Sequence, residues 1–155
     1  MTLEERIYKD YVEALKAKDK AKTDFLSFIR AELKNAAIDL RKEKLDDNEV
    51  FTVLKKQKKR LYETKESIVS SGREDLLKDV DRELALLSEY LPPPLAENEL
   101  TEIINQVISE VNALSMKDMG RVMKGVLAKT GARADSKHVS ELVRNKLSSF
   151  LKETN

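Results

Sequence analysis

Three basic residues near the end of the chain are spaced as one face of a helix. Lys117, Arg121 and Lys124 stand at positions i, i+4 and i+7, which a helix brings to the same side. Ammonium and guanidinium groups aligned in this way can hold the phosphates of a nucleic acid. Two further basic residues, Lys129 and Arg133, follow closely. We therefore expect these five residues to form a nucleic-acid-binding site, although basic residues also serve as an ordinary solvated helix face and favour helix C-termini.

The residues between these bases predict how they are positioned. Met119, Val122 and Met123 fall on the opposite side of the same helix, where they would face a core. Gly120 and Gly125 do not form a phosphate loop, because no Lys-Ser or Lys-Thr pair follows and no strand precedes them. We expect the two glycines to permit close helix packing or a local bend.

A second basic run, from Lys55 to Arg60, is the densest positive segment of the chain. Such runs can bind nucleic acid. These bases surround an apolar stripe, however, so the solvated exterior of a long helix is the favoured interpretation.

The residue types exclude several kinds of catalysis. The 155 residues contain no cysteine and one histidine, His138, which rules out disulfides, thiolate metal sites, cysteine nucleophiles and a histidine-based metal cluster within one chain. We expect no catalytic residues, no metal and no cofactor. The sequence has no long apolar run, and its acidic start lacks the features of a signal peptide, so we expect a cytoplasmic protein without membrane contact.

The net charge of +1 conceals an uneven distribution. Residues 1–91 carry 20 basic and 20 acidic side chains, whereas residues 114–152 carry nine basic and three acidic ones. The positive charge therefore lies in the last third of the chain, where it can attract phosphate.

Apolar residues recur every three or four positions throughout, which predicts an all-α fold with no strand. The first half should contain four helices, with a junction near Asp19. The third should begin at Asp46, which has capping-box spacing to Glu49, and end at Gly72. The fourth should run from Arg73 towards Leu91 and form an antiparallel hairpin with the third.

Apolar residues predict the buried faces of these helices. The stripe of the second helix comprises Phe25, Phe28, Ile29, Leu33, Ala36 and Leu40. That of the third, with coiled-coil-like spacing, comprises Val50, Leu54, Gln57, Leu61, Thr64 and Ile68.

Three consecutive prolines, Pro92 to Pro94, mark the best domain boundary, because they cannot continue a helix and form a stiff spacer. We expect an N-terminal helical domain (residues 1–91), a linker (92–96) and a small three-helix C-terminal domain (97–155). Asp135 should cap the last helix, and Arg133 could reach either a carboxylate or a phosphate.

The order of several motifs resembles the GatB/YqeY family along almost the whole chain. They are Gly72-Arg73-Glu74-Asp75-Leu76, Glu83-Leu84, Tyr90-Leu91-Pro92, Met119-Gly120-Arg121-Val122-Met123 and Gly131-Ala132-Arg133-Ala134-Asp135. The family includes small YqeY-type proteins and the tail of the B subunit of the glutamine-dependent aspartyl/glutamyl-tRNA amidotransferase. The resemblance implies an all-α fold whose tail is associated with tRNA recognition. Ala96 departs from the pattern where a capping serine is common.

The resemblance implies an accessory protein that associates with tRNA or another structured RNA, and that acts beside an amidotransferase or other translation-related proteins. The family's label is carbon–nitrogen ligase activity with glutamine as amide donor. An activated nucleophile and a metal–phosphate site, which that chemistry needs, are not visible in the sequence. The alternative function is a helical protein–protein interaction module that binds no RNA.

Overall fold

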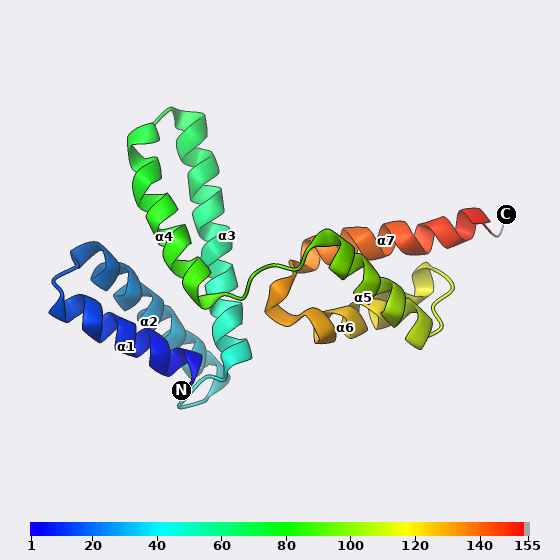
Figure 1. Ribbon diagram of the computed structural model, residues 1–155, viewed down its shortest axis with the longest axis horizontal. Helices are drawn as coiled ribbons and strands as arrows, with labels where there is room; N and C mark the ends of the chain where they lie inside the picture. Colours follow the sequence, from blue (N-terminus) through cyan, green and yellow to red (C-terminus); the bar gives the residue numbers. More distant parts are fainter. Residues whose placement is uncertain (154–155) are drawn as a thin grey trace. The chain divides into compact units, whose positions relative to one another are not determined.

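The computed structural model describes residues 1–153, with side chains up to Phe150, and its described part is all-α as expected. The helices are α1 (Leu3–Lys16), α2 (Lys20–Leu40), α3 (Asp47–Ser71), α4 (Leu77–Tyr90), α5 (Glu97–Glu110), α6 (Met119–Thr130) and α7 (Ser136–Glu153) (Figure 1). Three 3-10 turns accompany them: η1 (Glu74–Leu76), η2 (Met116–Asp118) and η3 (Gly131–Arg133).

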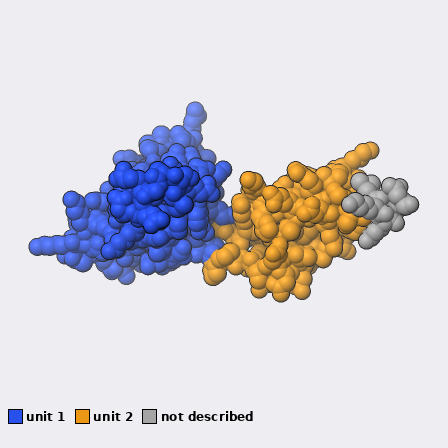
Figure 2. Space-filling view, turned by 90° about the horizontal axis from the view of Figure 1, so that it is seen from above, with its two compact units in different colours: residues 1–92 blue, residues 93–155 orange. Residues whose placement is uncertain are grey.

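The chain divides into two compact units, the N-terminal unit (residues 1–92) and the C-terminal unit (residues 93 onward) (Figure 2). The division falls within the proline run, where a helix cannot continue. No helix in the described part of the chain is long and apolar enough to cross a membrane.

Two helical hairpins build the N-terminal unit, and polar caps set their limits. The side chain of Thr2 caps α1 and that of Asp19 caps α2, so the expected junction near Asp19 is correct. Residues from both hairpins share one core, in which Ile7, Leu26 and Leu54 are fully buried.

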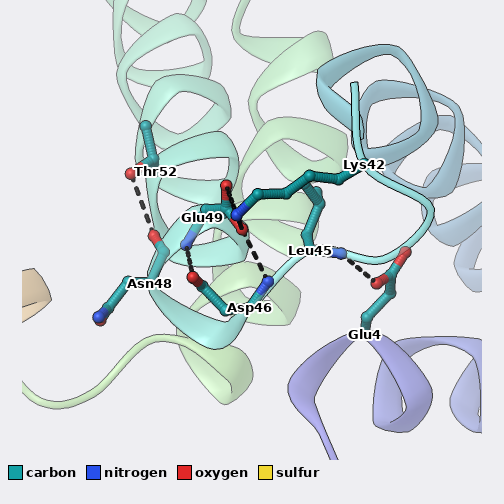
Figure 3. Close-up of polar contacts among 7 residues, drawn as sticks. All are labelled: Glu4, Lys42, Leu45, Asp46, Asn48, Glu49 and Thr52. Atoms are coloured by element: carbon teal, nitrogen blue, oxygen red, sulfur yellow. Dashed lines mark hydrogen bonds and ion pairs between the residues drawn. The ribbon is translucent and has the colours of Figure 1, made fainter. Parts of the chain in front are cut away.

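The start of α3 is held by a network of polar contacts (Figure 3). The backbone N–H of Glu49 donates to the Asp46 carboxylate at 2.8 Å, and the Asp46 N–H donates to Glu49 at 2.9 Å, which confirms the predicted capping box. Lys42 also donates to Glu49 at 2.9 Å, and Leu45 N–H donates to Glu4 of α1 at 3.0 Å. The connection between the two hairpins is therefore fixed to α1 as well as to α3.

A left-handed residue ends α3, as predicted. Gly72 has φ 74°, a conformation that glycine adopts without a Cβ penalty. The next helix starts later than expected, because the 3-10 turn η1 follows Arg73 and α4 begins only at Leu77. Beyond the main core, Ile68, Val80 and Leu84 form a separate cluster between α3 and α4.

Some expected core positions are exposed. Phe28 and Leu40 of α2 are 47% and 50% exposed, whereas Leu26 is fully buried in their place. Thr64 of α3 is also exposed, and its hydroxyl donates to the Arg60 carbonyl. The periodicity identified the helices correctly but placed the edges of their apolar faces wrongly.

The C-terminal unit is a three-helix bundle of α5, α6 and α7 with its own apolar core. Val122, Val126, Val139, Val143 and Leu147 are fully buried in it. The backbone N–H of Leu95 donates to the Arg133 carbonyl at 2.9 Å, which fastens the segment after the prolines. The N-cap of α5, Ala96, makes no side-chain cap, as its residue type implies.

The two helical glycines of α6 differ sharply. A Cβ on Gly125 would lie 2.6 Å from Val107 Cγ1 of α5, so this glycine permits close helix packing. A Cβ on Gly120 would meet nothing within 4 Å. Close packing is therefore confirmed for Gly125 and does not hold for Gly120, for which the expected local bend stays a prediction.

Candidate nucleic-acid interface

The helix α6 is amphipathic, and this property places the candidate residues. Val122 and Val126 point into the core, while Arg121 and Lys124 are exposed. Lys117 is also exposed but lies in η2, one turn before α6 begins, rather than in the helix itself. Because η2 runs directly into α6, these three residues still follow one outward face, which we call the basic face of α6.

The two lysines of the basic face have no partner in the described part of the chain. Neither Lys117 nor Lys124 makes a side-chain hydrogen bond or ion pair with any described residue. A solvated ammonium group without an internal partner can approach a phosphate without first breaking an ion pair. Both lysines are therefore available to an anionic ligand.

Asp118 organises the start of this face. Its carboxylate accepts hydrogen bonds from the backbone N–H groups of Leu114 at 2.9 Å and Ser115 at 3.3 Å. It also accepts one from Arg121 Nη2 at 2.6 Å. The Leu114 N–H, followed by the Arg121 guanidinium, lowers the pKa of Asp118 below its ordinary value.

The contact with Asp118 orients Arg121 and leaves most of its N–H donors free of Asp118. The Arg121 side chain is 61% exposed, and a guanidinium has five N–H donors, only one of which bonds to Asp118 here. The remaining donors suit the planar recognition of a phosphate. The ion pair does reduce the net charge of the face, since Asp118 neutralises Arg121 in part.

The other two expected site residues are directed elsewhere. Lys129 Nζ forms an ion pair with Glu110 Oε1 of α5 at 2.8 Å, so it lies on the flank of α6 that faces α5. Arg133, in η3, donates to the Lys129 carbonyl at 3.2 Å. This bond holds the Arg133 guanidinium against the last turn of α6, and its expected contact with a carboxylate or a phosphate stays a prediction. The structure thus places three of the five bases on one face and the other two outside it, and phosphate binding by Lys129 and Arg133 stays a prediction.

Two other polar residues near the tail make contacts within the C-terminal unit. Asp135 precedes α7, and its carboxylate accepts a long hydrogen bond from Lys137 N–H at 3.4 Å, consistent with the expected cap. His138 is exposed, with its Nε2 3.7 Å from Glu97 Oε1. Among the described residues, no group of histidine and carboxylate side chains is arranged to hold a metal ion.

Sequence reasoning overlooked Asp118, although a signal was present. Ser115 and Asp118 have the spacing of a capping box, and the structure contains that box at the start of η2. The motif therefore encodes both the helix start and the carboxylate that orients Arg121.

The second basic run lies on α3, where Lys56, Lys59 and Arg60 are exposed.

Comparison with known proteins connects the chain to one family. The YqeY family model, described as Yqey-like protein, matches residues 4–147. Altered inheritance of mitochondria protein 41, mitochondrial, from Pyrenophora tritici-repentis is 26% identical over 142 residues, covering 90% of this chain and 77% of that protein.

A second relative is part of a tRNA amidotransferase. A glutamyl-tRNA(Gln) amidotransferase subunit from Thermococcus sibiricus is 32% identical over 120 residues, covering 72% of this chain. The match spans only 19% of that protein, so most of its length has no counterpart in the match.

Proposed function

The chain belongs to the family of Yqey-like proteins, and from this premise we propose that its C-terminal unit binds tRNA or another structured RNA through the phosphate backbone. The observation that carries the proposal is the basic face of α6, where Lys117 and Lys124, which have no side-chain partner among the described residues, flank an Arg121 oriented by Asp118. The similarity to part of a tRNA amidotransferase supports tRNA as the first RNA to test.

The proposed role is that of an accessory binding protein rather than an enzyme. The 155 residues contain no cysteine, so glutamine hydrolysis through a cysteine nucleophile is excluded for this chain alone. We propose that the protein acts in the cytoplasm beside an amidotransferase or another translation-related protein. The carbon–nitrogen ligase chemistry would then belong to that partner.

The test is tRNA binding by fluorescence anisotropy at several salt concentrations. Each phosphate neutralised by the protein contributes ~0.7–0.9 to the slope of log affinity against log salt. Replacing Lys117, Arg121 and Lys124 together by alanine should lower the slope by about 2 and weaken binding to all RNAs alike. Helicity should persist, because alanine favours helices and these side chains face away from the core.

A matched control removes the same charge from the other basic surface. Lys56, Lys59 and Arg60 of α3 are exposed, and their triple alanine variant should bind like the wild type. A reversed result, with the α3 variant losing affinity instead, would move the site to the N-terminal unit. No binding by the wild type at low salt would refute the proposal.

One feature of the N-terminal unit favours the alternative, a protein-interaction module. A cavity of about 590 Å³ opens between α2, α3 and α4, with Phe25, Phe28 and Leu61 in its lining. Charged residues, including Glu83, complete the wall, and burial raises the pKa of Glu83. A protein complex that survives nuclease treatment but is lost in Phe28→Asp would support this alternative.

A further inference from the structure

Gly120 is an exposed glycine of α6, and neither its backbone conformation nor a close neighbour requires glycine at this position. Its backbone is not in the left-handed region, and a Cβ there would meet nothing within 4 Å. Glycine destabilises a helix relative to alanine because it loses more conformational freedom on folding. Gly125, five residues later, differs because its missing Cβ makes room for Val107. Neither a left-handed backbone nor a close neighbour therefore accounts for Gly120.

The surroundings of Gly120 indicate what approaches it. Lys117 stands three residues before it and Lys124 four residues after it, so both lysines are its neighbours on the helix surface. Neither lysine has a partner among the described residues. Arg121, the next residue, carries a guanidinium held by Asp118 at 2.6 Å. The glycine thus leaves a gap in the side-chain layer between Lys117 and Lys124, whereas the Arg121 guanidinium is directed towards Asp118.

We propose that Gly120 is the point at which the RNA sugar–phosphate backbone comes closest to the protein, an inference that rests on the proposed function. With no side chain at this position, a phosphate can contact the helix backbone while Lys117 and Lys124 bind its oxygens from either side. A methyl group at position 120 would hold the phosphate farther from both lysines. The positive charges at this surface favour a phosphate backbone over an apolar protein segment.

The test exploits a conflict between stability and binding. Gly120→Ala should raise the melting temperature of the full-length protein by about 2–8 °C, because alanine favours the helix and meets no neighbour. The same variant should bind tRNA about tenfold more weakly, a change equivalent to about 1.4 kcal/mol. Because it retains every charge, its salt slope should stay closer to the wild-type value than that of the triple alanine variant.

Asn105→Ala is the matched control, since it introduces a better helix former at an exposed position of α5 in the same unit. It should raise the melting temperature and leave tRNA binding unchanged. Gly120→Leu, with a larger side chain, should weaken binding further than Gly120→Ala.

Three results would overturn the inference, and they are distinguishable. A stabilised Gly120→Ala that binds tRNA as well as the wild type would show that nothing contacts the gap, while leaving the proposed function intact. A lower melting temperature for Gly120→Ala would reveal a structural need for the glycine. Absence of tRNA binding by the wild type would refute both the inference and the proposed function.

Discussion

Asp118 links the fold of the tail to its proposed function through a single carboxylate. It accepts two backbone N–H groups at the helix start and the guanidinium of Arg121. Helix capping and the orientation of a phosphate-binding side chain therefore depend on the same charge. No described carboxylate holds Lys117 or Lys124 as Asp118 holds Arg121. The two lysines therefore add positive charge to the face, but their side chains are not fixed in one orientation.

The lowered pKa of Asp118 predicts an acid-dependent contribution to stability. A carboxyl whose pKa is lower in the folded than in the unfolded state stabilises the fold. This stabilisation is complete above the pKa of the unfolded state, near pH 4, and is lost as the pH falls through the pKa of the folded state. Asp118→Asn should therefore melt a few degrees below the wild type at pH 7, and the difference should shrink below about pH 4. Thermal melts between pH 7 and pH 3 measure it.

Glu102→Gln provides a control for the loss of one negative charge, because Glu102 is exposed on α5 and makes no ion pair with a described residue. It should differ little from the wild type at any pH in this range. A melting difference for Asp118→Asn that stays constant from pH 7 to pH 3 would contradict the role assigned to the carboxylate.

At the scale of the helices, the contact between α5 and α6 depends on the absence of one side chain. Gly125→Ala would place a Cβ 2.6 Å from Val107 Cγ1, too close for the two helices to keep their spacing. Overpacking of this kind costs about 1–3 kcal/mol, whereas the higher helix propensity of alanine restores at most about 1 kcal/mol. The clash should prevail, and Gly125→Ala should lower the free energy of unfolding by about 1 kcal/mol in denaturant titrations.

The comparison with Gly120→Ala sharpens this prediction, since the same substitution at two positions of one helix should change stability in opposite directions. If both variants are stabilised, Val107 can move aside, and the packing interpretation of Gly125 is wrong.

The helices were predictable because their signals are local. The capping box of Asp46 and Glu49 and the stop at Gly72 depend on a few neighbouring residues, and the structure contains both. The exposure of Phe28 could not be predicted, because it depends on which helices pack beside α2, and periodicity does not specify that. The same limit applies to Lys129, whose partner Glu110 comes from another helix. The spacing of the bases predicted the basic face. It did not predict which bases form ion pairs with other described residues.

At the scale of the whole molecule, the proline run separates the two compact units. We propose that the units fold as separate cooperative domains, because a stiff extended spacer limits the contacts that couple them. Binding at the basic face of α6 should then leave the structure of the N-terminal unit unchanged.

The central claim, that RNA binds the basic face of α6, is tested most directly by nuclear magnetic resonance of the full-length protein. Uniformly ¹⁵N-labelled protein is titrated with unlabelled tRNA, and the backbone amide signals are followed residue by residue. Shifts and broadening should concentrate at residues 117–124, with Gly120 among the most affected, while the signals of residues 55–60 in α3 should stay in place. Changes confined to the N-terminal unit, or no changes at low salt, would contradict it.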